Sequence, residues 1–315
     1  MLLLAQGCIT FFAYAQKTIF VNPTITFMKG ICKLYQSQCD LRNSHVYPSF
    51  VVDYLKNTGS KYLRNATTPN LRQQDGIKRF WLSHEAEEDF SRREKWFAEN
   101  VFLKYLVDKQ NKFEYDENLY YFSLSFLWRI LLLEIDHPSI KRLSFFPLLL
   151  DVAEEWRLFL KDKTLPLKYK NINILFTHDI VHHSAGLTGV DYYFTRMLDG
   201  CVIGNRDCTY IAIYGKFLKF MFWCVIRNDK SIDDKYLRIN PDKGVINTQQ
   251  TFHDSEMASF FINRMQSLEA LAKPSEKQQE KIMQEMLKDK NGFYNSDAGR
   301  AIINDIYLSD KTKNK

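Results

Sequence analysis

Residues 31–50 read ICKLYQSQCDLRNSHVYPSF and carry the strongest indication of the fold. Two cysteines, Cys32 and Cys39, precede the segment Ser44-His45-Val46-Tyr47-Pro48. A histidine can act as a general base, because its ordinary pKa lies near neutrality. His45 has two interpretations at this point: it is a catalytic base, or it is a packed histidine that bonds to the backbone in a turn.

Working outward from this stretch, the sequence predicts a short helix over residues 51–59, followed by a basic loop over 60–80. Ser83 is a plausible N-cap for a helix over 83–106, because acids fill the first turn. Further helices are expected at 117–135, 146–162, 252–271 and 275–289. Ser275 and Gln278 fit a capping box at the start of the last of these. Short Ile-, Val-, Phe- and Tyr-rich segments predict the strands of a small antiparallel sheet: 171–177, 201–204, 208–215 and 218–226.

The composition is that of an ordinary globular protein, with 45% hydrophobic and 25% charged residues. Only 12 Gly and 8 Pro occur in 315 residues, so helices should dominate. A net charge of +6 permits contact with nucleic acid but does not require it. Motifs for phosphate-binding loops, dinucleotide binding and nucleophile elbows do not occur, which disfavours the corresponding enzyme classes.

Residues 1–27 have two interpretations. Met1–Ala15 is apolar and ends in Ala-Tyr-Ala, as a secretory signal does, but no Lys or Arg precedes the apolar run. Either these 27 residues are an extension upstream of a natural start at Met28, which makes the protein cytoplasmic, or Met1–Ala15 is a signal and the protein is exported. We expect the first, because the informative segment follows directly after Met28. The apolar run Leu119–Ile135 contains two Ser, an Arg and a Glu, so we expect a buried helix and no stable membrane span.

The chain resembles a largely uncharacterised family of bacterial HNH-like, treble-clef proteins. The resemblance rests on residues 31–35, 39–50, 70–76, 90–100, 125–129, 153–157 and 196–199. It implies a unit in which a general-base histidine lies beside one divalent metal ion. It also implies an ancestral nuclease, in a bacterial defence or mobile-element setting.

The resemblance implies a structural zinc site that this chain has largely lost. The family's four cysteine positions fall at Cys32, Tyr35, Ser83 and Ala86, so one of four ligands remains. Tetrahedral thiolate zinc cannot be built from Tyr, Ser and Ala side chains. Either packing replaces the structural zinc, which is the outcome we expect, or Cys32, Cys39 and His84 form an improvised site.

The catalytic metal is also in doubt. Ser44 stands where active HNH enzymes usually have a metal ligand before the base, and it is a weak ligand. Glu87 falls near the position that often carries the third ligand, and a carboxylate can bind Mg²⁺ or Mn²⁺. If activity survives, His45 is the base and Glu87, with His84, holds the metal. The alternative for Glu87 is a solvated first turn of a helix.

The stretch 56–79 is basic, with Asp75 as its one acid. Its candidate phosphate contacts are Lys61, Arg64, Arg72, Lys78 and Arg79. Such contacts would position the protein on DNA or RNA without reading sequence. The alternative is a soluble loop.

A second cluster holds three of the seven histidines, His178, His182 and His183, together with Asp179. On a helix, His178 and His182 would share a face, which suits a metal ion. The segment follows a predicted strand directly, so polar residues at a strand end are the favoured interpretation.

Together these observations predict an α+β protein. A degenerate treble-clef, HNH-like module (28–105) would pack on a mainly helical domain with a small antiparallel sheet (106–310), followed by a polar tail (311–315). The leading hypothesis is a nucleic-acid-associated protein with impaired or lost phosphodiester cleavage. The alternative is a non-enzymatic scaffold that keeps the fold only. No residue pattern identifies a protein partner.

Overall fold

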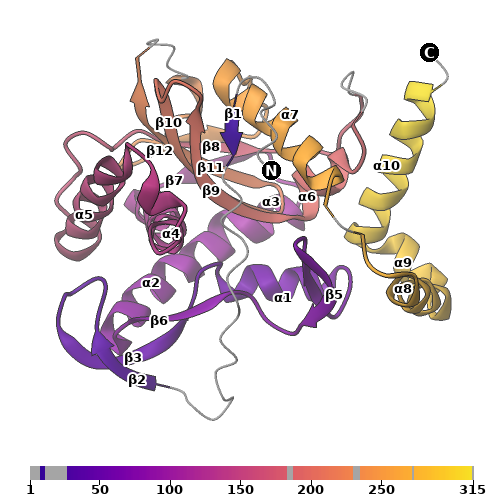
Figure 1. Cartoon of the computed structure of the whole chain (residues 1–315), viewed down its shortest axis with the longest axis horizontal. Helices are drawn as coiled ribbons and strands as arrows, with labels where there is room; N and C mark the ends of the chain where they lie inside the picture. The colour runs from indigo at the N-terminus through magenta and orange to yellow at the C-terminus, as the bar shows by residue number, and fades with distance from the viewer. Residues whose placement is uncertain (1–7, 11–26, 183–186, 230–234, 272, 314–315) are drawn as a thin grey trace.

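The computed structural model describes residues 8–10, 27–182, 187–229, 235–271 and 273–313. Within them the chain is an α+β protein in which helices surround small antiparallel sheets (Figure 1). The predicted class is therefore confirmed at this level. The interpretations of Met1–Ala15 lie outside the described residues, apart from the strand β1 (Cys8–Thr10).

The N-terminal part is built on a three-stranded sheet of order β2-β3-β6. Its strands are β2 (Phe27–Ile31), β3 (Gln38–His45) and β6 (Lys78–Leu82). Helix α1 (Ser49–Asn57) follows β3, and α2 (His84–Phe97) follows β6 and runs on through η1 (Ala98–Phe102) and α3 (Leu103–Leu106). The helices predicted at 51–59 and 83–106 are thus present.

The loop predicted over residues 60–80 was wrong in part. This segment forms a hairpin of β4 (Leu63–Asn65) and β5 (Thr68–Gln73) before β6 begins. None of the hairpin side chains is fully buried, so the hairpin has no alternating apolar pattern in the sequence.

Helix α4 (Glu117–Ile135) is buried along almost its whole length, and α5 (Phe146–Asp162) packs beside it after the short η2 (Ile140–Arg142). Because α4 lies against α2, α5 and strands of the main sheet, apolar residues are needed on every side of it. This confirms the buried helix predicted from the apolar run. In the part of the chain that the structure describes, no helix combines the length and apolar character needed to cross a membrane.

The main sheet has the order β1-β9-β10-β11-β8, and all its neighbours are antiparallel. Its predicted strands are confirmed as β8 (Ile172–Phe176), β9 (Leu198–Asn205), β10 (Tyr210–Phe217) and β11 (Phe220–Asn228). Alternate residues of β10 enter different cores: Ile211 and Ile213 face the core around α4, whereas Tyr210 and Tyr214 face the core around α7. Gly215 is required on β10 because a Cβ there would lie 2.7 Å from Phe126 of α4.

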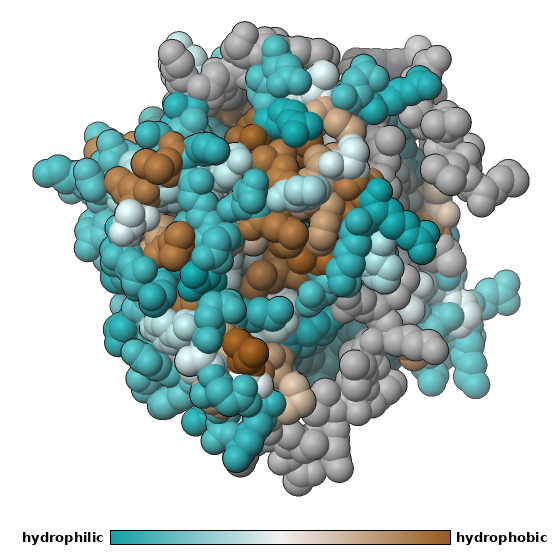
Figure 2. All heavy atoms as spheres, turned by 60° about the vertical axis from the view of Figure 1, so that its left-hand side comes forward, coloured by the Kyte–Doolittle hydropathy of each residue, from teal (hydrophilic) through white to brown (hydrophobic). Residues whose placement is uncertain are grey.

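Phenylalanine rings join the N-terminal part to the main sheet. Phe97 of α2 stacks on Phe122 of α4 with centroids 4.0 Å apart, and it meets Phe217 and Phe220 of the sheet edge-on. One apolar core therefore contains residues from both sides of position 105. Figure 2 shows apolar residues near the centre of one face, with hydrophilic residues around them.

The remaining elements are a second small sheet, the helices of the second core, and three C-terminal helices that we call the C-terminal arm. A two-stranded sheet pairs β7 (Lys112–Tyr115) with β12 (Gly244–Asn247). Helices α6 (Val190–Arg196) and α7 (Ser255–Glu269) contribute to the second core, as does Leu237 of the short η3 (Lys235–Leu237). The arm consists of α8 (Glu276–Lys288), α9 (Lys290–Asn295) and α10 (Asp297–Lys313).

The predicted capping box at Ser275 was wrong, although α8 begins where expected. Ser275 is the N-cap residue, but its side chain makes no capping hydrogen bond. Its backbone N–H instead donates to Asn70 of β5 (2.8 Å), and the Gln278 side chain accepts from Arg64. Contacts with a distant hairpin therefore replace the local motif.

Candidate functional site

The four positions at which the sequence resemblance predicts zinc ligands, Cys32, Tyr35, Ser83 and Ala86, lie together in the structure. Cys32, in the turn after β2, is fully buried. Its Sγ accepts hydrogen bonds from the N–H groups of Tyr35 (3.5 Å) and Ser83 (3.3 Å), and its thiol donates to Ser83 Oγ (3.6 Å). Ser83 Oγ in turn accepts from Ala86 N–H (3.3 Å), which caps α2 as predicted. Hydrogen bonds thus join the turn after β2 to the start of α2.

This junction supports a prediction about stability. Ser83→Ala should lower the free energy of unfolding by about 1 kcal/mol, because α2 loses its side-chain cap and the Cys32 thiol loses its acceptor. Ser83→Thr keeps a hydroxyl at the same place and should cost clearly less. Urea unfolding of the two variants measures the difference, and equal losses would contradict the role given to the hydroxyl.

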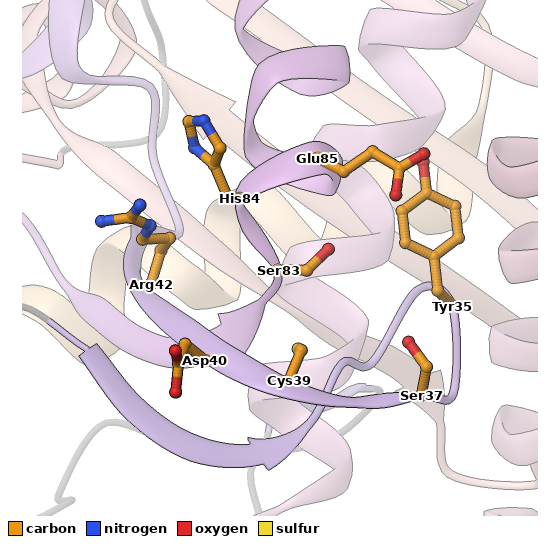
Figure 3. A pocket seen from close by; sticks show the side chains of 8 residues that line it. All are labelled: Tyr35, Ser37, Cys39, Asp40, Arg42, Ser83, His84 and Glu85. Atoms are coloured by element: carbon orange, nitrogen blue, oxygen red, sulfur yellow. The ribbon is translucent and has the colours of Figure 1, made fainter.

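A shallow pocket of about 480 Å³ opens beside this junction. Figure 3 shows Cys39 on β3 and Ser83 at the start of α2 lining it, with Tyr35 and Glu85 close together at one end. His84 also lines the pocket, and its Nε2 lies 3.2 Å from Glu88 on the exposed side of the helix. Burial and the neighbouring Cys32 raise the pKa of the Cys39 thiol above its ordinary value.

His45 lies at the end of β3 beside Asp75. Its Nε2 is 3.0 Å from Asp75 Oδ1, and Lys78 Nζ is 2.6 Å from Asp75 Oδ2. Burial alone would raise the pKa of Asp75, but hydrogen bonds from Lys78, His45 and the Gly76 N–H outweigh it and lower the pKa to about 2. The ionised carboxylate can hold His45 as the tautomer protonated on Nε2, so that Nδ1 carries the lone pair.

Two residues beneath His45 form a buried ion pair. Arg129 of α4 donates from Nη1 to the His45 carbonyl oxygen (3.0 Å) and to Glu94 Oε1 of α2 (2.7 Å). Burial raises the pKa of Glu94 and Arg129 opposes that rise, while Glu87 and His45 also act electrostatically on Glu94. Two of the predicted site residues, Glu87 and His45, therefore influence the charge state of Glu94. Neither Asp75 nor Glu94 is among the site residues predicted from the sequence.

The predicted metal ligands are not gathered into one group. Within the described ranges, no three His, Cys, Asp or Glu side chains are placed to hold a metal ion together. Ser44 is buried, and its hydroxyl donates to the Arg42 carbonyl oxygen (3.3 Å). Glu87 is half-buried on α2, one helical turn from the exposed His84.

The five predicted phosphate contacts come from adjoining elements, and within the described residues four of them have partners. Lys61 is exposed before β4. Arg64 donates to the Pro69 carbonyl oxygen (2.7 Å), and Arg72 pairs with Glu285 of α8 (2.7 Å). Lys78 pairs with Asp75, and Arg79 donates to the Lys78 carbonyl oxygen (2.8 Å).

The described part of the histidine cluster, residues 178–182, is not helical. His178 Nε2 lies 2.8 Å from the Thr248 carbonyl oxygen, and its Nδ1 lies 3.3 Å from the Tyr105 hydroxyl. Asp179 pairs with Lys219 at 2.5 Å, His182 is exposed, and His183 lies outside the described residues. Hydrogen bonding to a strand end accounts for His178 without a metal ion.

Comparisons of the chain with protein-family models, with curated proteins and with solved structures each found no match.

Proposed function

We propose that residues 28–105 are a treble-clef, HNH-like module that has lost its structural zinc, and that the protein binds nucleic acid through the basic side chains of β4, β5 and β6. The observation that carries this proposal is the junction of Cys32, Tyr35, Ser83 and Ala86. Cys32 and Ser83 are 51 positions apart in the sequence, yet the two pairs of residues meet where the zinc site of such a module would lie. Hydrogen bonds of the thiol, the hydroxyl and the backbone there link the turn after β2 to the start of α2.

The same geometry supports weak or lost phosphodiester cleavage. The ammonium group of Lys78 lies on Asp75, so a divalent cation beside the His45–Asp75 pair would be repelled by a positive charge. Ser44 uses its hydroxyl within the strand. Surviving activity would use His45 Nδ1 as the base for water, with Mg²⁺ or Mn²⁺ held at Glu87 to neutralise charge on the phosphate.

The first test concerns metal and cleavage. Elemental analysis of the purified protein should find no stoichiometric zinc. A nuclease assay with Mg²⁺ or Mn²⁺ should find cleavage absent or very slow. Cleavage that disappears in His45→Ala would instead establish an active one-metal nuclease, and bound zinc would overturn the replacement of the zinc site by hydrogen bonds.

The second test concerns nucleic acid. The protein should bind duplex DNA or RNA with an affinity that falls steeply with salt, because phosphate contacts release counterions. Changing both Arg64 and Arg72 to Gln should reduce the slope of log K against log salt by roughly 2, about 0.9 for each lost contact on duplex DNA. Changing Lys141 and Arg142 of η2 to Gln removes the same charge elsewhere and is the control. Binding that responds equally to both double variants, or no binding at all, would favour the scaffold alternative.

A further inference from the structure

The β4–β5 hairpin presents two arginines directly opposite each other. Arg64 and Arg72 are cross-strand partners. Like charges at such positions repel each other, and burial followed by the charge of Arg72 lowers the pKa of Arg64. Arg64 is fixed by the Pro69 carbonyl oxygen, and the Arg72 guanidinium lies 4.9 Å from the centre of the Tyr62 ring. The pair is thus held in place, and its charges favour an oxygen ligand between or beside them.

Helix α8 supplies those oxygens. Glu285 Oε1 accepts from Arg72 Nη2 (2.7 Å), and Gln278 Oε1 accepts from Arg64 Nη2 (3.3 Å). The two α8 residues are seven positions apart, which is about two helical turns, so they project from one face. Asn70 of β5 also accepts from the N–H of Ser275 at the start of the helix. Three hydrogen bonds therefore attach α8 to the hairpin. The two elements are neighbours in Figure 1.

This attachment is polar and superficial. No residue of α8 is buried, and Met283 and Leu287 are each more than half exposed. Arg72 and Glu285 are themselves 30% and 49% exposed, and ion pairs at such exposure contribute little to stability. The helix can therefore leave the hairpin at small cost, whereas α10 is fixed to α6 because Asp305 accepts from the N–H groups of Asp191 and Tyr192.

We propose that α8 is a displaceable plug on a phosphate-binding site. The Glu285 carboxylate and the Gln278 amide oxygen occupy the arginine pair in place of phosphate oxygens, and a nucleic-acid backbone displaces them. Guanidinium groups bind carboxylate and phosphate oxygens by the same charge-assisted geometry, so one can replace the other. This inference rests on the proposed function, and it adds that the chain restrains its own binding.

The test compares two variants that change the net charge equally. Glu285→Gln removes the ion pair with Arg72. Glu280→Gln lies five residues away, roughly 140° around the helix, and serves as the control. With a short mixed-sequence DNA duplex in a fluorescence anisotropy assay, Glu285→Gln should bind about threefold more tightly than wild type, the size expected for an exposed pair. Glu280→Gln should bind like wild type.

Hydrogen exchange provides a second readout on the same complex. Addition of the duplex should make α8 amides exchange faster and β4–β5 amides exchange more slowly. Unchanged α8 exchange with a protected hairpin overturns the plug, and so does equal enhancement in both glutamine variants. If wild type and Glu285→Gln bind alike while the Arg64 and Arg72 double variant binds weakly, the plug fails and the proposed function stands. If none of the proteins binds DNA or RNA, the proposed function fails and the plug fails with it.

Discussion

Arg129→Met should lower the free energy of unfolding by about 3–5 kcal/mol, because it leaves the Glu94 carboxylate without its counter-charge in a poorly solvated place. The Arg129 side chain is 4% exposed and that of Glu94 is 17% exposed. The same guanidinium holds the His45 carbonyl oxygen and lies over the Phe90 ring. The variant should therefore also loosen the end of β3. Urea unfolding, with the midpoint and its slope fitted together, measures the loss.

Replacing both partners is the matched control. Arg129→Met combined with Glu94→Met removes the pair without leaving a charge behind, and it should cost much less than the single change. If the double variant is as unstable as Arg129→Met, packing around the guanidinium rather than its charge explains the loss.

The loss in Arg129→Met should also depend on pH. Burial already raises the pKa of Glu94, and removing Arg129 raises it further. An acid whose pKa is higher in the folded than in the unfolded protein lowers the stability of the fold only when it is ionised. This destabilisation is absent below the unfolded pKa and becomes complete as pH rises through the folded pKa. The variant should thus recover toward wild type in acid, where Glu94 is protonated. A loss that does not change with pH would argue against an unpaired carboxylate.

Elements with strong local signals were predictable from sequence. Helices α4 and α5 and the main-sheet strands β8, β9, β10 and β11 overlap their predicted ranges, because long apolar runs and β-branched segments mark them directly. Strand β1 of the same sheet was not predicted. The Ser83 cap was also predictable, since its partner is three residues away. The β4–β5 hairpin was missed because its strands are polar and half-exposed.

The site was predictable only in outline. His45 and the basic residues were identified as candidates, but the Asp75 partner of His45 lies 30 residues away and the Arg129 donor lies 84 residues away. The contacts of α8 with the hairpin join residues more than 200 positions apart. No local pattern encodes such pairs, and the same contacts explain why Ser275 and Gln278 do not form the local capping box.

The other large loss of stability is expected in the second core, around α7. Asp199→Asn should lower the free energy of unfolding by about 3–5 kcal/mol. Asp199 of β9 and Arg264 of α7 form an ion pair in which both side chains are at most 7% exposed. Asp199 Oδ2 also accepts from Arg264 Nε (2.8 Å) and from the Tyr193 hydroxyl (2.9 Å). Asparagine keeps the shape of the side chain but removes the negative charge that Asp199 places against the buried Arg264 guanidinium.

The buried side chain of Lys216 should make the stability of Asp199→Asn depend on pH. Burial lowers the pKa of Lys216 to about 7, and Asp199 opposes that fall. Without Asp199 the lysine should release its proton more readily. For a base whose folded pKa is depressed, the destabilisation is complete below the folded pKa and is relieved as pH rises toward the unfolded value. Asp199→Asn should therefore be most unstable in mildly acidic solution and recover in part above neutrality.

Tyr214→Phe is the control for this network. It removes one hydroxyl, which lies 3.3 Å from the Tyr193 hydroxyl, and keeps the ring that packs on Phe260. Loss of one neutral hydrogen bond should cost about 1 kcal/mol and should not vary with pH near neutrality. If Asp199→Asn costs no more than Tyr214→Phe, the Asp199–Arg264 pair does not hold β9 to α7, and the apolar contacts of Phe260 and Met257 must do so instead.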